Sequence, residues 1–263
     1  MRRSFLSELL FPPKCVGCKE RLDIFDGKRR DEDAFCPKCR AEWEREKLES
    51  CPSCGVAAID CACCPSTLKR KYIDCIALIK FGRTLSADRL IYTIKKRRLQ
   101  KAFSFASDEL AKRFKGYCHR YNLDLSEAIF TNVPRKASSV ARYGFDHAKL
   151  LSEMTAKLTG NEYAELLVRR GRSRDQKKLS GEERRSNVEG KFAVAPNTDL
   201  KGKTVVLVDD VVTTGNTAYQ CIRALRKQGV SKVVLLSIAR APQKKRPRRR
   251  KRRIKSEKDE RPD

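Results

Sequence analysis

Two acidic residues and a run of small hydroxyl residues follow the most apolar stretch of this sequence. Asp209 and Asp210 come directly after the continuous apolar run 204–208, which is typical of a central parallel strand. The loop that then opens a helix consists of Thr213, Thr214, Gly215, Asn216 and Thr217. Backbone N–H groups at a helix N-terminus form a cup for a phosphate. Because two carboxylates would repel an isolated phosphate, the pattern predicts a ligand that also offers hydroxyl groups or a Mg²⁺ ion.

Nine of the twelve cysteines lie between positions 15 and 64, where eight of them form four Cys-x-x-Cys pairs and Cys63 is left over. Two such pairs complete a tetrahedral site with Zn–S bonds of about 2.3 Å. The paired residues are Cys15, Cys18, Cys36, Cys39, Cys51, Cys54, Cys61 and Cys64. Sequential pairing would place the first four in one site and the last four in another, and interleaved pairing also fits the spacing. Since cysteine fills every ligand position, we predict two structural zinc ions and no catalytic metal here.

Disulfides and a thioredoxin-like redox pair are the alternatives for these cysteines. The first residues lack a signal-peptide pattern, and no apolar run approaches the ~18 residues of a membrane span. We therefore expect a cytoplasmic protein without a membrane span, which disfavours disulfides. A redox pair needs one Cys-x-x-Cys at a helix start beside a βαβ unit, whereas these pairs come in sets within a loop-rich stretch.

The formal net charge is +27, and it is spread over two parts of the chain. Residues 243–263 contribute +8 and the remainder +19, so a polyanion or a phosphorylated ligand is the expected class of partner. The run 244–253 could neutralise nucleic-acid phosphates without regard to sequence. It contains no aromatic residue for base stacking, and the alternative is a terminus that only aids solubility.

Strand and helix patterns alternate after the cysteine-rich part, which predicts an α/β domain with a mostly parallel sheet. The expected strands are 73–79, 128–133, 166–168, 191–194, 204–208 and 233–239, and the expected helices are 85–98, 103–114, 145–158 and 217–228. The polar stretch 169–190 is expected to be a long loop that could close over a ligand. We divide the chain into a double zinc-finger module at 1–68, the α/β domain at 69–242 and a disordered basic tail at 243–263.

The segment 205–217 resembles the signature of type I phosphoribosyltransferases. The resemblance implies that Asp209 and Asp210 are the catalytic carboxylates, which hold the ribose hydroxyls of phosphoribosyl pyrophosphate beside its Mg²⁺. It also implies that the loop 213–217 grips the 5-phosphate.

With zinc knuckles before such a domain, the chain resembles the ComF/GntX family, which is linked to natural competence and DNA uptake. The family's Val-Pro segment and its Arg-Gly-Phe-Asn-Gln stretch correspond to 133–134 and 142–147. Asp146 and His147 depart from Asn-Gln, and Tyr143 is inserted after the arginine. The candidate pyrophosphate contacts are Arg135, Lys136 and Arg142. His147 could contact the ligand, but a lone histidine at a helix start is more often a cap or surface residue.

The resemblance implies a ComF-like protein that binds phosphoribosyl pyrophosphate with Mg²⁺ and handles single-stranded DNA during natural transformation. Competence or recombination proteins would then be its protein partners. Two alternatives stay open, namely a nucleobase-salvage phosphoribosyltransferase and a non-catalytic DNA-binding adaptor. The sequence contains no recognisable nucleobase-specificity segment, so it decides neither the acceptor nor whether turnover occurs.

Overall fold

The structure is a computed structural model, and it describes residues 12–22, 33–48, 56–57, 60–61, 66–68, 73–80, 82–170, 191–196 and 198–241. Cys51, Cys54, Cys64 and the basic tail therefore lie outside the described residues. No helix in the described ranges is both long and apolar enough to cross a membrane.

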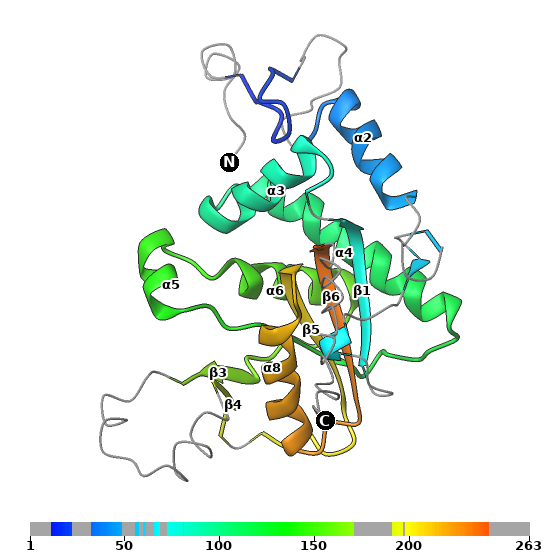
Figure 1. The fold of residues 1–263 in the computed structure, drawn as a ribbon, viewed down its shortest axis with the longest axis vertical. Coiled ribbons are helices and arrows are strands. Elements are labelled where there is room, and N and C mark those ends of the chain that lie inside the picture. Colours follow the sequence, from blue (N-terminus) through cyan, green and yellow to red (C-terminus); the bar gives the residue numbers. More distant parts are fainter. Residues whose placement is uncertain are drawn as a thin grey trace, which may run out of the picture.

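A sheet of four parallel strands occupies the centre of the described α/β part (Figure 1). Its order is β1-β6-β5-β2, with β1 at Ile73–Lys80, β2 at Ile129–Asn132, β5 at Thr204–Val212 and β6 at Lys232–Arg240. The inner strands are apolar and buried, as expected for a parallel sheet that is covered on both faces. The predicted α/β fold with a parallel sheet is confirmed.

Helices cover the two faces of this sheet. The long helices α4 (Gln100–Arg120) and α6 (His147–Thr159) pack on one face, and α3 (Leu85–Lys96) extends that layer. The other face carries α8 (Asn216–Lys227). An antiparallel hairpin of β3 (Leu167–Arg169) and β4 (Phe192–Val194) contacts α8.

Successive residues of β5 contribute to two different apolar cores, because side chains along a strand alternate between the faces. Val206 and Val208 belong to the core under α4 and α6, whereas Val205 and Leu207 belong to the core under α8. This alternation decides where polar side chains at the end of the strand point.

The described residues between 12 and 48 of the cysteine module contribute to the first of these cores, the one under α4 and α6. Its helix α2 (Pro37–Leu48) inserts Trp43, which is fully buried. The Trp43 and Phe35 rings pack edge-on against Phe105 of α4, with centroid distances of 5.3 and 4.9 Å. In Figure 1 the cysteine-bearing segment and α2 lie at one end of the molecule, beside α3. The module is therefore docked on the α/β domain.

Several predicted boundaries shift in the structure. The helix expected at 103–114 runs over Gln100–Arg120, and the short helix α5 (Ala137–Tyr143) was not predicted. The strand expected to stop at 208 continues through the two aspartates to Val212. Its pairing with β6 persists there, with Asp209 opposite Ser237, so the ladder hydrogen bonds extend the strand past the acidic residues.

Candidate ligand site and metal centre

The predicted ligand site has two parts, the segment 209–217 and the basic residues that follow β2, and these parts come from neighbouring strands. β2 pairs with β5 in parallel, and the N–H of Val133 donates to the carbonyl of Val208 at 3.1 Å. The chain after β2 therefore leaves the sheet beside Asp209 and Asp210. Carboxyl ends of adjacent parallel strands are where α/β sheets bind their ligands.

Asp210 is buried and faces α3 and α6. Its Oδ2 atom is in direct contact with Nε2 of His147, and the Nζ of Lys95 lies 3.4 Å from its Oδ1. Loss of hydration opposes ionisation of Asp210, but contact with His147 and the charge of Lys95 lower the pKa of its carboxyl group. Asp210 is therefore a carboxylate at neutral pH.

Asp209 lies on the opposite side of the strand. Loss of hydration and the charge of Asp210 raise the pKa of Asp209 well above its usual value. Its Oδ1 accepts a hydrogen bond from the backbone N–H of Asp210 at 2.9 Å. On the α8 face, burial and the charge of Asp209 raise the pKa of Cys221. The two acids thus have different environments and different proton affinities.

The loop after β5 has the features expected of a phosphate-binding turn. Gly215 is the N-cap of α8 with φ of 77°, in the left-handed region that favours glycine, and it offers no side chain to cap the helix. The Thr214 Oγ1 atom accepts from the N–H of Asn216 at 3.4 Å, and the N–H groups that follow in the first turn are the uncapped ones in the described structure. Thr213, Thr214, Asn216 and Thr217 are exposed. The uncapped N–H groups at this helix start are available to an anion.

The short 3₁₀ helix η2 (Ser66–Leu68) packs against this loop. The hydroxyl of Thr67 donates to the carbonyl of Thr214, and a Cβ at Gly215 would lie 2.9 Å from the Thr67 Oγ1 atom. Leu68 is fully buried beneath it. Residues 66–68, at the end of the predicted zinc-finger module, therefore support the loop, and the sequence carried no signal for that contact.

The basic residues predicted to contact pyrophosphate do not all lie close together in the structure. Arg135 follows β2, and its guanidinium lies 5.5 Å from the ring centroid of Tyr143. Lys136 is the exposed N-cap of α5, and Arg142 is exposed near its end. Of the polar lid expected at 169–190, only Arg169 and Arg170 lie within the described residues. Two cavities of about 180 and 220 Å³ are lined by other residues, so a cavity shared by 209–217 stays a prediction.

His147 is neither the helix cap nor a surface residue, contrary to what its position at a helix start led us to expect. It is 5% exposed, and the helix cap is Asp146, whose Oδ1 accepts from the N–H groups of Ala148 and Lys149 at 2.9 and 3.2 Å. An aspartate before an apolar helix pattern is a common N-cap, and that signal could have identified it.

Four cysteines of the module converge at one point. The Sγ atoms of Cys15, Cys18, Cys36 and Cys39 all lie within 4.8 Å of one another, and those of Cys18 and Cys36 are 3.7 Å apart. Tetrahedral zinc with Zn–S bonds of about 2.3 Å requires sulfur atoms about 3.8 Å apart. A Cβ at Gly17 would lie 2.8 Å from the Cys39 Sγ, so the knuckle closes tightly around the thiols. This set can hold a zinc ion, and it corresponds to the first site of the sequential pairing.

One thiol of this set ionises more readily than a free cysteine. Burial opposes ionisation of Cys15, but backbone hydrogen bonds from Cys36 and Cys18 lower the pKa of its thiol to about 7. The first of these runs from the Cys36 N–H to the Cys15 Sγ at 3.3 Å. Thiolates are the form that binds zinc. Of the second predicted set only Cys61 is described, and its carbonyl accepts from the buried Arg113 at 2.9 Å.

We expect Cys36→Ser to release the zinc of this site, because three cysteines rarely hold structural zinc tightly. Zinc measured by plasma emission should fall by about one ion per chain. The melting temperature should fall as well, since Cys15 and Trp43 share the core of α4. Cys118→Ser is the matched control, because Cys118 is a partly buried cysteine of α4 outside the cluster. Unchanged zinc in Cys36→Ser would contradict the assignment.

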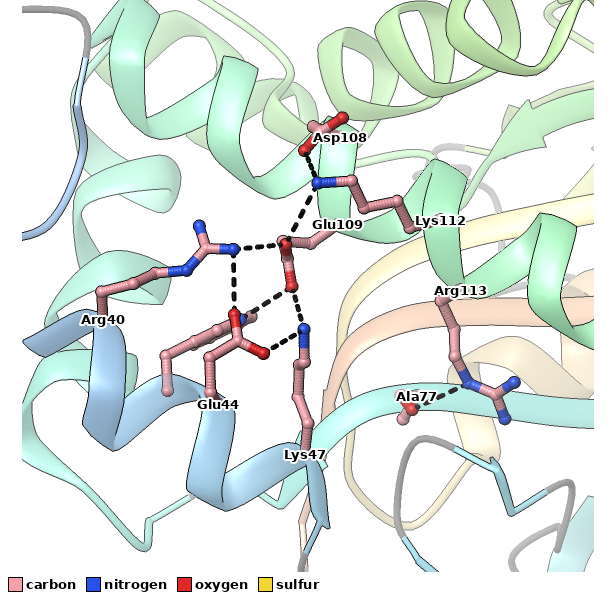
Figure 2. Close-up of polar contacts among 9 residues, drawn as sticks. Arg40, Glu44, Lys47, Ala77, Asp108, Glu109, Lys112 and Arg113 are labelled. Atoms are coloured by element: carbon pink, nitrogen blue, oxygen red, sulfur yellow. Dashed lines mark hydrogen bonds and ion pairs between the residues drawn. The ribbon is translucent and has the colours of Figure 1, made fainter.

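A buried acid of α4 forms polar contacts with helix α2 of the cysteine module, as Figure 2 shows. Glu109 of α4 has a side chain that is 2% exposed, and it accepts from Trp43 Nε1 at 2.9 Å. Lys47 Nζ and Arg40 Nη2 approach its two oxygens at 2.8 and 3.1 Å. One turn further, Arg113 donates to the carbonyl of Ala77 at 3.4 Å. Sequence reasoning assigned none of these residues.

Comparison of the sequence with protein families and with individual proteins finds similar sequences. A family model, the phosphoribosyl transferase domain, matches residues 149–261. Competence protein F of Haemophilus influenzae is 33% identical over 123 residues, which make up 46% of this chain and 53% of that protein. Competence protein ComFC of Streptococcus pneumoniae is 26% identical over 215 residues, which make up 81% of this chain and 90% of that protein. This chain thus spans about half the length of the first relative and most of the second.

Among solved structures, the allosteric regulatory enzyme of purine biosynthesis superposes with a TM-score of 0.40 and 21% identity. The superposition covers 57% of this chain and 30% of that one. The family match and the parallel sheet together confirm the predicted phosphoribosyltransferase-type fold.

Proposed function

We propose that this chain, whose relatives support its assignment to the ComF family, binds phosphoribosyl pyrophosphate or a related ribose phosphate with Mg²⁺. We further propose that it acts in handling single-stranded DNA during natural transformation. The observation that carries the first part is the end of β5, where an ionised Asp210 precedes the glycine N-cap of α8. Carboxylates accept hydrogen bonds from ribose hydroxyls, while helix N–H groups hold a phosphate.

The proposed roles divide between two strand ends. Asp209 and Asp210 would hold the ribose hydroxyls, and the loop 213–217 would hold the 5-phosphate. The basic residues that follow β2, chiefly Arg135, would contact the diphosphate. Mg²⁺ would accompany the diphosphate and neutralise part of its charge.

Calorimetry with phosphoribosyl pyrophosphate and Mg²⁺ on the zinc-loaded full chain tests this proposal. We expect saturable binding that requires Mg²⁺. Pyrophosphate release with a panel of free bases then separates a salvage enzyme from a ligand-sensing protein, since only the former turns over. Absence of binding by the full chain would overturn the proposed ligand.

The DNA part of the proposal rests on the basic run 244–253 and on the competence proteins among the relatives. Removing residues 243–263 takes away a net charge of +8. We expect the truncated chain to bind single-stranded DNA about tenfold or more weakly at ~50 mM salt, with a flatter salt dependence, because fewer counterions are released. Fluorescence anisotropy with a labelled oligonucleotide measures both quantities. Equal affinity of the two chains would exclude a DNA role for the tail.

A further inference from the structure

A ring of polar contacts joins Asp210 to the basic loop that follows β2. His147 contacts one oxygen of Asp210, and Lys95 lies 3.4 Å from the other. The Oδ2 atom of Asp146 accepts from the backbone N–H of Arg135 at 3.2 Å. The guanidinium of Arg135 donates in turn to the carbonyl of Lys95 at 3.4 Å, which closes the ring. The ring thus connects the two halves of the proposed ligand site.

His147 holds a central place in this ring because it begins α6. The cap by Asp146 fixes the first turn of the helix, so the imidazole is held against β5. Its Nδ1 atom is buried, and none of the described residues hydrogen-bonds to it. The Nε2 atom is therefore the one through which His147 acts on its neighbours. The Asp210 Oδ2 atom that Nε2 contacts is also buried and has no hydrogen bond from the described residues, so a proton on Nε2 would be placed to donate to it.

We infer that His147 is a positioning residue, whose Nε2–H holds the Asp210 carboxylate in the orientation that accepts a ribose hydroxyl. This inference rests on the proposed function, since it concerns the same site. Lys95 supplies positive charge, but its side chain is 38% exposed, so water competes with Asp210 for its ammonium group. The buried imidazole, with a side chain that is 7% exposed, is the rigid donor of the pair.

The expected loss of ligand affinity follows from the hydrogen bond that Asp210 loses when His147 is replaced. Its carboxylate is 5% exposed, so water replaces the lost hydrogen bond poorly. The carboxylate would rotate toward Lys95 and away from its ligand-binding orientation. Small misplacements in a preorganised site cost one to two powers of ten. We therefore expect the affinity for the ribose phosphate to fall about 10- to 100-fold.

Two substitutions separate donation from packing. His147→Leu retains much of the volume but has no donor, whereas His147→Gln retains an N–H that can reach Asp210. Calorimetry with phosphoribosyl pyrophosphate and Mg²⁺ should show 10- to 100-fold weaker binding for the leucine variant and a loss of about threefold or less for the glutamine variant. Melting temperatures of both variants show whether each is folded. Wild-type affinity of the leucine variant, or equal weakening of both, would overturn the inference.

A second measurement uses the unaltered protein and so does not depend on how the variants fold. The chain contains two histidines, His147 in the ring and His119 in the last turn of α4. In a ¹⁵N spectrum of histidine-labelled protein, adding the ligand with Mg²⁺ should shift the Nε2 resonance of His147 and leave that of His119 unchanged. An unmoved His147 resonance in a sample that binds the ligand would overturn the inference alone. A wild-type chain that binds no ligand would overturn the proposed function and this inference with it.

Discussion

Replacing both Asp209 and Asp210 by asparagine should weaken the binding of phosphoribosyl pyrophosphate about 100-fold or more. Asp210 is an ionised carboxylate, and losing a hydrogen bond to a charged group costs about 1.5–3 kcal/mol. The loss of a second hydrogen bond at Asp209 brings the total to about the 2.8 kcal/mol of a 100-fold change. Calorimetry in the presence of Mg²⁺ measures the change directly.

Whether the variant binds the ligand more weakly or more tightly distinguishes the ribose-binding role from one in which the acids only repel the anionic ligand. Asparagine removes the negative charge of Asp210 near an anionic ligand, so acids that only repelled the ligand would give tighter binding in the variant. Glu153→Gln provides the matched control, because it removes a charge from an exposed residue of α6. Unchanged or tighter binding in the double variant would contradict the ribose-binding role.

The sequence was most informative where pattern and local chemistry coincide. The apolar run 204–208 and the loop 213–217 predicted a central strand that leads into a helix, and the structure has both as β5 and α8. The spacing of Cys15, Cys18, Cys36 and Cys39 predicted a four-sulfur set, and their Sγ atoms lie together. In each case residues close in sequence, or paired by a fixed motif, determine the structure.

Contacts between distant segments could not be predicted in this way. Asp209 and Asp210 are adjacent in sequence, yet strand alternation and the continued pairing with β6 place them in different environments. The contact of His147 with Asp210 joins residues far apart in the chain and depends on how α6 packs beside β5. Periodicity shows that α6 exists, but it does not give the position of its first residue relative to a strand.

The docking of the cysteine module was missed although the sequence held a partial signal. Glu109 lies between Ala106 and Leu110, two buried residues of α4. An acid on the apolar stripe of a helix requires a buried partner. Its partners, however, come from α2, and nothing in the sequence pairs the two helices.

We expect Glu109→Ala to destabilise the protein by about 3 kcal/mol. The substitution leaves the buried indole N–H of Trp43 without an acceptor, and Arg40 and Lys47 keep only the exposed carboxylate of Glu44 as a shared partner. Removing one member of a buried ion pair costs about 3–5 kcal/mol. Arg40 is 41% exposed and recovers hydration, which places the expected loss at the lower end of that range. Urea unfolding followed by tryptophan fluorescence reports on the affected site, because Trp43 is the chain's single tryptophan.

The contribution of Glu109 should also depend on pH with a definite sign. Burial opposes its ionisation, but hydrogen bonds from Lys47 and Trp43 and the charges of Lys47 and Arg40 hold its pKa below the usual 4.5. A carboxyl group whose pKa is lower in the folded state stabilises the protein above its unfolded pKa. The difference in unfolding free energy between wild type and Glu109→Gln should therefore be complete above about pH 4.5 and shrink as the pH falls further.

A substitution of the neighbouring acid tests whether the loss of stability comes from the buried contact of Glu109 or from a general effect of charge. Asp108 precedes Glu109 on the same helix and pairs with Lys112 at 2.6 Å, but its side chain is 49% exposed (Figure 2). Asp108→Asn should change the unfolding free energy by less than about 0.5 kcal/mol, as exposed ion pairs do. Equal effects of Asp108→Asn and Glu109→Gln would show that net charge, and not the anchor on α2, accounts for the loss. A large effect of Glu109→Gln alone would assign the loss to the buried contact between α4 and α2, because only that carboxylate accepts from Trp43.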